Sequence, residues 1–447
     1  MIGLWRGTIQ RIDLTSYEPF INQTVTVRGG VAEDPSVGGS NELRLRLNNV
    51  IIGDVELPGQ VWVSVIGQIQ DVRRSDVVEI SGKLKTGFGT FPASMSFAHL
   101  DKIERQAGVD PAREVRDAFG ERLATAIDEP EVDLGMGILA GQKTALPIDA
   151  NEAFRVAGLT HIVVASGYNL TILIRFARRL FARVSRFAAL SFGGILVFAF
   201  ACVTGFSPSM TRAALVAGLS LLAWYYGRKF HPVVLLTIVA ATTVVINPIY
   251  VWGDAGWYMS FTSFIGVIML APLIQNYFWG KEREMVVPWR AKAWVNLRRK
   301  IFTKKKLADP ALRERTFSIR QIFIETMSAQ AMTMPIIALM MGQFAPYGLL
   351  ANLLVLPIVP LAMLLTFIAG LASILVPGVA TIIAWPAQKL LGYIIEVARK
   401  IAELPGASQE VAFGWQMLVI SVVALVAAMF YMWCRTGHKF RDDNPVD

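Results

Sequence analysis

The sequence predicts a polytopic α-helical membrane protein of about nine spans, some broken or re-entrant, with an N-terminal extracytoplasmic OB-type β-barrel. Of the 447 residues, 54% are hydrophobic and only 17% are charged, whereas about a quarter of the residues in a soluble protein are charged. Several apolar runs are near 20 residues long, which is the helix length that crosses a hydrocarbon core of about 30 Å. The first ~110 residues are polar instead, and they alternate between apolar and polar side chains.

The barrel prediction depends on five short runs that have the two-residue period of a β-strand. In one of them Leu43, Leu45 and Leu47 alternate with Arg44 and Arg46. The five runs are QTVTVRG, ELRLRLN, QVWVSVIG, DVVEISGKL and ASMSFAHLDKI. Clusters of glycine and proline such as EDPSVGGSN and KTGFGTFP separate them. Five strands in about 85 residues suggest a small barrel of the OB type, which we assign to residues 1–108.

The outward face of this barrel carries candidate residues for binding a single nucleic-acid strand. They are Arg28, Arg44, Arg46 and Trp62. OB barrels hold single strands by combining aromatic stacking with basic side chains. The alternative is that these residues only form the polar outer face that any soluble barrel needs.

The rest of the chain is predicted to be helical. Residues 109–158 are predicted as amphipathic or interfacial helices and residues 159–434 as a transmembrane domain with a basic loop at 279–320, followed by a tail at 435–447. Prolines between residues 347 and 402 allow broken or re-entrant helices there. The predicted spans are 160–178, 187–205, 209–226, 232–250, 256–276, 321–342, 347–375, 378–402 and 414–433.

The basic loops predict the orientation in the cytoplasmic (inner) membrane. RFARRLFARVSR, GRKF, the stretch 281–320 and CRTGHKFR all fall on one side of the predicted spans, and the positive-inside rule makes that side the cytoplasm. The barrel is then outside and the C-terminus inside. The N-terminal stretch MIGLWRGTIQRIDL has no signal-peptide core, so we expect upstream transmembrane segments that this sequence lacks, or else an unusual insertion route.

The first predicted span contains a polar break, GLTHIVVASGYNLTILIRFARRL, with His161, Ser166, Gly167 and Asn169 near its middle. Polar groups are costly in a bilayer unless they face a partner or a hydrated path. Ser166 and Asn169 share a helix face, whereas His161 and Ser166 point about 140° apart on a regular helix. A His–Ser catalytic pair therefore needs a break at Gly167. Contacts between helices, pore lining and intramembrane hydrolysis remain as alternatives.

Four further residues are candidates for the pore. Arg212 begins one span and Asp254 begins another on the same side, so they either pair with each other or Arg212 meets an incoming anion. Gln330 and Asn352 lie in apolar surroundings, where hydrogen bonding between helices is as plausible as pore lining. The sequence has no Walker loop and no HExxH motif, so we expect no cofactor and no metal site.

The elements around the break resemble a known family. GLTHIVVASGYNLTIL resembles the GLTHLLAISGLHVGLL element of the ComEC family of DNA-uptake channels. GILAGQKTALP resembles the preceding LLLGD element, and SPSMTRAALVAGLSLLAWYYGRK resembles the serine-then-RA helix with its GR exit. DAGWYMSFTSFIGV is similar to DPGFQLSFLAVLGI, and NLLVLPIVP is similar to NLLAVPL. The resemblance covers roughly residues 20–375.

The resemblance implies a channel that passes one DNA strand into the cytoplasm during natural transformation. The implied partners are single-stranded DNA, the lipid bilayer, a DNA receptor and a separate nuclease outside, and a helicase-like ATPase in the cytoplasm. Three positions differ from the family pattern, namely Asn169 for a histidine, Gln142 for an aspartate and Tyr258 for a glutamine. These differences argue against a mechanism in which that histidine or aspartate titrates.

Many family members end in a metallo-β-lactamase-like domain with an HxHxDH motif, and none of the four histidines here belongs to one. We therefore expect no enzyme activity in this chain. A secondary transporter of a small or lipid-linked anionic substrate is the alternative function, and an intramembrane hydrolase is the third.

Overall fold

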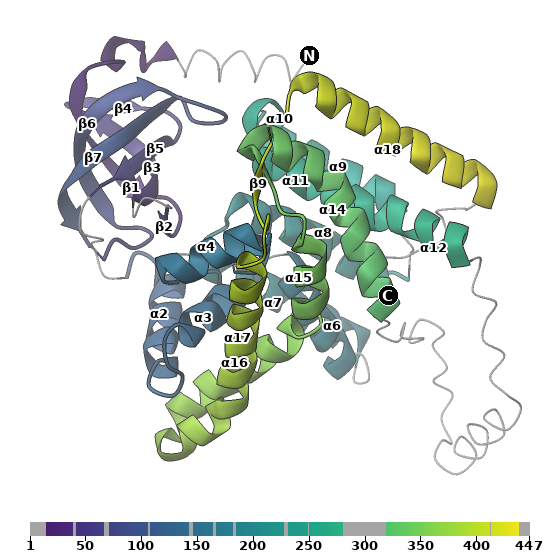
Figure 1. Cartoon of the computed structure of the whole chain (residues 1–447). Helices are drawn as coiled ribbons and strands as arrows, with labels where there is room; N and C mark the ends of the chain where they lie inside the picture. Colours follow the sequence, from purple (N-terminus) through teal and green to yellow (C-terminus); the bar gives the residue numbers. More distant parts are fainter. Residues whose placement is uncertain are drawn as a thin grey trace, which may run out of the picture.

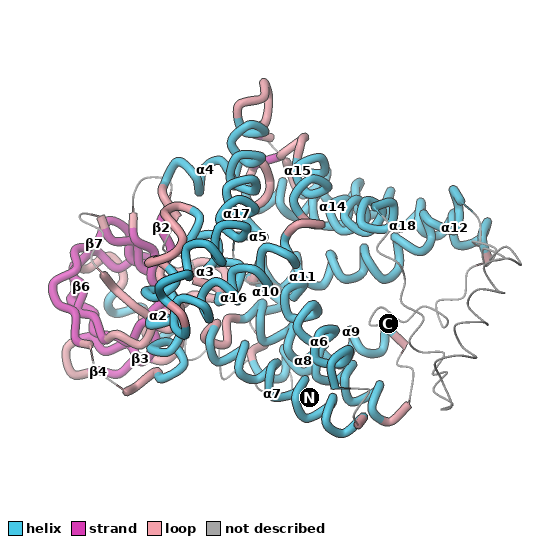
Figure 2. The backbone as a smooth tube through the Cα atoms, turned by 90° about the horizontal axis from the view of Figure 1, so that it is seen from below, coloured by secondary structure: helices cyan, strands magenta, loops and turns pink. Residues whose placement is uncertain are grey.

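The molecule consists of a β-barrel followed by a helical domain. The barrel lies at one end, and the helices α12 (Ala271–Trp279) and α18 (Trp415–Thr436) lie at the opposite end in both views (Figure 1, Figure 2). The computed structural model describes residues 15–38, 42–66, 71–105, 108–142, 146–163, 167–181, 185–227, 231–248, 250–279, 319–411 and 413–437.

All five predicted strand runs are strands. Two short strands extend the sheet beside β3, and a 3-10 turn, η1, precedes the first strand. The bounds are η1 Glu18–Phe20, β1 Thr24–Val31, β2 Ser36–Val37, β3 Leu43–Ile52, β4 Val55–Leu57, β5 Val61–Val65, β6 Val77–Thr86 and β7 Ala93–Glu104.

The five main strands close into a barrel. β1 pairs with both β3 and β6, and the remaining neighbours are β3–β5, β5–β7 and β6–β7. Among these five neighbouring pairs, only β5–β7 is parallel. This strand order, with one parallel pair, is the arrangement of an OB-type barrel. Leu43, Leu45 and Leu47 point into the core, while Arg44 and Arg46 point outward, as the alternation predicts. The OB-like barrel is confirmed.

Helix α2 (Pro111–Leu123) joins the barrel to the helical domain. Asp110 begins the helix by accepting a hydrogen bond from the Arg113 backbone N–H at 2.9 Å, and proline at the first turn suits this start. Arg116 points toward the barrel and donates two hydrogen bonds to the carboxylate of Asp34, at 2.5 and 2.9 Å. Both side chains are buried. The barrel is therefore attached to α2 through buried charges as well as through the chain.

The helical domain continues with three short helices, α3, α4 and α5, and then with helices that are mostly longer and apolar. One π-helical turn, η2, connects α11 with α12, and a two-stranded ribbon joins the regions around residues 343 and 410. The bounds are α3 Glu131–Ala140, α4 Ile148–Val156, α5 Thr160–Val163, α6 Gly167–Phe181, α7 Arg186–Val203, α8 Pro208–Tyr225, α9 Pro232–Ile246, α10 Tyr250–Gly253, α11 Ala255–Ile265, η2 Gly266–Leu270, α14 Ile319–Met341, β8 Gln343–Phe344, α15 Gly348–Val355, α16 Val359–Leu375, η4 Pro377–Val379, α17 Ala380–Ala402 and β9 Gln409–Glu410.

Several of these helices are long and apolar enough to cross a membrane. Within the described residues there are five, or six if α15 and α16, which meet at a bend of 49°, count as one span. They are Arg186–Val203, Ala255–Trp279, Arg320–Met340, Pro377–Ala402 and Trp415–Thr436. The prediction of nine spans is confirmed only to this extent, because α9 has 15 residues and the first predicted span is divided into α5 and α6. Residues 164–166 of the predicted polar break, between these two helices, lie outside the described residues.

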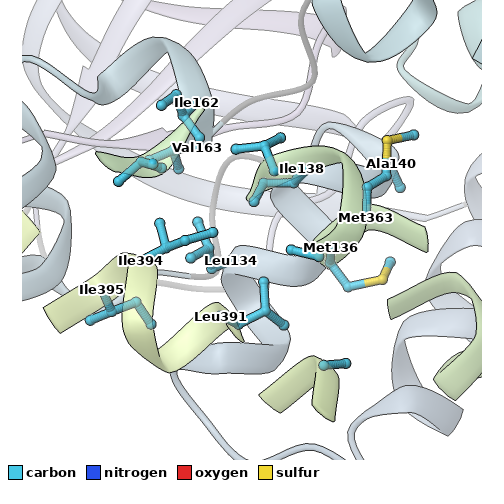
Figure 3. Packing of buried hydrophobic residues seen from close by; sticks show 14 of the residues in the cluster. Leu134, Met136, Ile138, Ala140, Ile162, Val163, Met363, Leu391, Ile394 and Ile395 are labelled. Carbon is cyan, nitrogen blue, oxygen red and sulfur yellow. The ribbon is translucent and has the colours of Figure 1, made fainter. Parts of the chain in front are cut away.

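The core of the helical domain surrounds α3. Seven of its ten residues are buried, and it packs against α5, α16 and α17. Figure 3 shows Leu134 and Ile138 of α3 among Met363 of α16 and Leu391 and Ile394 of α17. Each fully buried Leu or Ile side chain stabilises the fold by about 1.5–3 kcal/mol relative to an exposed one.

Asp133 lies on the first turns of this helix and carries a stability cost. Burial, together with the neighbouring charge of Glu129, raises the pKa of Asp133 to about 6. The Asp133 carboxyl group therefore binds its proton more tightly in the folded state than in the unfolded state, where its pKa is near 4. Stability is unaffected below that unfolded value and falls as the pH rises to about 6, by up to about 3 kcal/mol.

We expect Asp133→Asn to raise the apparent unfolding temperature in detergent at pH 7.5 and to leave it unchanged at pH 4. Asp101→Asn, which changes an exposed carboxylate of β7, is the matched control. Equal unfolding temperatures of Asp133→Asn and wild type at pH 7.5 would contradict the prediction.

Candidate functional site

Arg212 on α8 is the buried cation at the centre of the candidate site. Only 4% of the residue is exposed, and Nη2 donates to the backbone oxygen of Gly256 on α11 at 2.9 Å. The other two nitrogens, Nε and Nη1, are buried and have no hydrogen-bond partner in the protein. A buried charged donor without a partner costs more than about 1–3 kcal/mol, so this arrangement needs a compensating ligand or water.

Asp254 is the carboxylate whose charge acts on Arg212, but no ion pair within 4 Å joins these two described residues. Asp254 instead begins α11, where its Oδ1 accepts the backbone N–H of Trp257 at 3.0 Å. The carboxylate and the Tyr250 side chain still exert an electrostatic influence on the guanidinium. The structure therefore brings Arg212 and Asp254 near each other and leaves two buried nitrogens of Arg212 without a partner in the protein.

The barrel docks next to this cation. The β6–β7 turn reaches α10, where Gly89 and Gly253 are in such close backbone contact that a methyl group on Gly253 would lie 2.5 Å from the Gly89 Cα. Glu33, in the loop after β1, is close enough to influence the hydroxyl of Tyr250. Gly253 immediately precedes Asp254, so the barrel touches the segment that Arg212 binds.

A second contact holds the barrel against α7. Arg74 donates to the backbone oxygens of Val203 at 3.0 Å and Cys202 at 3.3 Å, in the C-terminal turn of α7, where the helix's own carbonyl groups point outward and favour a cation. Its Nε pairs with Asp110 at 2.7 Å. Burial raises the pKa of Asp110, but the hydrogen bonds from Arg74 and from the Arg113 backbone outweigh it and the net pKa is lowered.

A second polar group lies where α5, α14 and α15 meet. His161 is exposed, and its ring lies beside Asn352 and the backbone of Gly158. The Gln330 amide packs on Gly348, which in turn contacts Gly158. Asn352 Oδ1 and Gln330 Oε1 are buried and have no partner in the protein. Three of the predicted pore residues are therefore brought together.

The predicted residues of the polar break have different positions. The buried Asn169 donates from Nδ2 to the Ile138 backbone oxygen at 2.8 Å, and so satisfies a carbonyl in the last turn of α3. Gly167 packs against Ala213 of α8, the neighbour of Arg212. Ser166 lies outside the described residues. Asn169 thus has a positioning contact, and Gly167 permits α6 to approach the helix that carries Arg212.

On the barrel, three of the four predicted residues share a surface. Arg46 and Trp62 are directly paired between β3 and β5, and Arg44 lies two residues from Arg46 on the same face. Arg28 lies on β1, opposite Ile51 at the far end of β3, and forms an ion pair with Glu104 at 2.7 Å. Arg44 forms an ion pair with Glu42. The pKa of the Glu42 carboxyl is lowered, first by a hydrogen bond from Ser64 and then by Arg44. Arg46 pairs with Glu33 at 2.8 Å.

Sequence reasoning missed the residues that connect the two domains. Gly89, Gly253 and Arg74 lie in turns and at helix ends with no periodic pattern. Phe88 and Phe91 flank a turn that the sequence identifies only by its glycines and proline. Among the described residues, no group of three or more His, Cys, Asp and Glu side chains has the geometry to hold a metal ion.

These features define a multi-pass membrane protein with a docked OB-like barrel and, close to the docking contact, a buried, partly unpartnered cation. A family model described as "Competence protein" matches residues 138–436, which is more than half of the chain. The chain belongs to this ComEC-type competence family, which confirms the resemblance, and the family acts in DNA uptake in transformation. No curated protein and no solved structure matches the chain.

Proposed function

We propose that the chain is the channel that carries one strand of incoming DNA through the cytoplasmic membrane during transformation, with the barrel outside and the C-terminus inside. The observation that carries the proposal is Arg212, a buried guanidinium with two nitrogens that have no partner in the protein. A guanidinium binds phosphate oxygens through its fork of N–H donors. The backbone of a DNA strand presents such a phosphate at every nucleotide.

The arrangement of the residues agrees with the demands of moving a polyanion through a low-dielectric medium. A pore has to replace the hydration of each phosphate with donors, and a few fixed groups allow release better than a continuous row of charges. Arg212 provides one cationic position next to the segment on which the barrel docks, and the His161, Gln330 and Asn352 group provides polar atoms elsewhere in the helical domain. Asp254, near Arg212, adds the repulsion that prevents a phosphate from remaining bound.

In this proposal the chain has no catalytic role. A nuclease and a DNA receptor outside supply the single strand, and a helicase-like ATPase in the cytoplasm pulls it. A small or lipid-linked anion is the alternative cargo, since it would use the same guanidinium.

Labelled donor DNA separates these cargoes. In a transformable cell whose only competence channel is this chain, we expect nuclease-protected DNA inside the cell, whereas a strain without the chain keeps its label outside. The alternative cargo gains support if protected DNA accumulates equally in both strains. Surface-bound label, which should be equal in both, controls for DNA capture.

A further inference from the structure

The outer face of the barrel carries an aromatic cluster that the sequence does not reveal as one feature. Trp62 of β5 meets Phe88 edge to face, with 5.4 Å between ring centroids, and Phe88 lies 5.6 Å from Phe91. The Arg46 guanidinium lies over the Phe91 ring at 5.5 Å from its centroid. We name these four residues, Arg46, Trp62, Phe88 and Phe91, the aromatic platform.

The strand register places basic and small residues in line with the aromatic platform. Arg46 is paired with Trp62, Trp62 with Ser94 and Ser94 with Lys85, across four neighbouring strands. Paired residues point to the same side of a sheet, so this row lies on the outer face. Ser94 is buried and binds the Thr86 backbone, while Lys85 is exposed. The row therefore has a cation at each end and aromatic surface between them.

The aromatic platform keeps surface open to a ligand. Phe88 is 52% exposed, although large aromatic side chains are normally covered. Its contacts with Trp62 and Phe91 are edge-to-face and tilted, so neither neighbour covers it as a parallel stack would. A planar, unpaired ring can stack on such a surface. Lys85 can meet the charges attached to it, and Arg46, which pairs with Glu33 through Nη1, still has further guanidinium N–H groups to offer.

The position of the turn that carries Phe88 and Phe91 connects the aromatic platform with the buried cation. Gly89, between the two phenylalanines, touches Gly253, and Arg212 binds Gly256 three residues further on. An aromatic turn beside a membrane domain also resembles an interfacial lipid anchor. The tip of this turn rests on protein, however, and Arg46 lies over one of its rings, which favours a charged ligand with planar groups.

We propose that the aromatic platform stacks unpaired nucleobases and delivers the strand to the entrance at Arg212. This inference rests on the proposed function and adds the chemical class that the barrel recognises, namely bases without a complementary strand. OB barrels gain most of their sequence-independent affinity from such stacking, and each stacked base contributes roughly tenfold or more to binding.

The test is oligonucleotide binding to the full chain in detergent, measured by fluorescence anisotropy. The probes are oligothymidylate and an abasic strand of equal length. We expect wild type to bind oligothymidylate at least about tenfold more tightly than the abasic strand. The double variant Phe88→Ala, Phe91→Ala should lose this difference and keep its affinity for the abasic strand, and Phe88→Trp should retain the difference. Phe97→Ala, which removes an exposed phenylalanine of β7 that is not part of the aromatic platform, is the matched control.

Three outcomes would overturn the inference: equal affinity of wild type for both probes, an equal loss for both in the double variant, or unchanged base-dependent binding accompanied by weaker association with lipid vesicles. The last outcome would identify an interfacial anchor.

Uptake assays on the same variants separate this inference from the proposed function. If Arg212→Ala abolishes uptake while the double variant binds bases normally, only the stacking role fails. If the double variant loses base binding while Arg212→Ala transports DNA normally, only the channel assignment at Arg212 fails.

Discussion

Replacing Arg212 with alanine is expected to reduce DNA uptake by roughly 100-fold or more, because it removes the buried donors that would meet each passing phosphate. Arg212→Lys should retain part of the activity, since a lysine keeps the charge but loses the planar fork. The measurement is the frequency of transformants together with nuclease-protected labelled DNA, at equal amounts of membrane-inserted protein.

Two further variants show whether Arg212 acts on cargo or on structure. Arg175→Ala removes an exposed arginine of α6 and should transform normally. Asp254→Asn keeps the hydrogen bond that begins α11 but removes the negative charge. We expect only a mild effect from it. An uptake loss in Asp254→Asn as large as in Arg212→Ala would show that the two residues act as a structural pair, and would refute the phosphate-binding role.

Replacing Arg116 with alanine is expected to destabilise the protein by about 3–5 kcal/mol. The guanidinium of Arg116 satisfies the buried carboxylate of Asp34 with two hydrogen bonds, and also contacts Asp117. Its removal leaves a buried, unpaired charge at the junction of the barrel and α2. The measurement is unfolding of the full chain in detergent, followed by limited proteolysis that detects release of the barrel.

Arg122→Ala is the control for this change, because Arg122 lies on the same helix and is exposed. The double variant Arg116→Met, Asp34→Leu should be less destabilised than Arg116→Ala alone, since it removes both charges together. Equal stabilities of Arg116→Ala and Arg122→Ala would show that the buried pair does not hold the barrel.

The strands and the helices were predictable because their signals are local. The alternation in ELRLRLN identifies a strand with one buried face, and an apolar run near 20 residues identifies a helix in lipid. The number of spans was less predictable, since helix ends depend on packing and turns. The prolines near residue 357 predict the break between α15 and α16, but they do not show whether the bent pair forms one span or a re-entrant loop.

Part of the candidate site was predictable because its sequence signals, too, are local. A charge or an amide in an apolar run identifies a residue that needs a partner, and Arg212, Gln330 and Asn352 all keep unpartnered atoms. The identity of the partner is a tertiary property. Asn169 was predicted to contact cargo, but its amide binds the carbonyl of Ile138, thirty-one residues earlier in the chain. The predicted alternative of an Arg212–Asp254 pair is not realised as an ion pair within 4 Å between these described residues.

The contacts of Arg74 and Arg116 also have a mechanical consequence. A strand drawn inward while it is still held by the barrel would pull the barrel against the helical domain. Arg74 donates a hydrogen bond to the end of α7, Arg116 donates to Asp34, and the backbone of Gly89 contacts that of Gly253. The force would thus pass through these contacts directly into the helices. The barrel would stay fixed while the DNA strand moves past it. The contacts between barrel and strand would therefore break before the contacts between barrel and helical domain do.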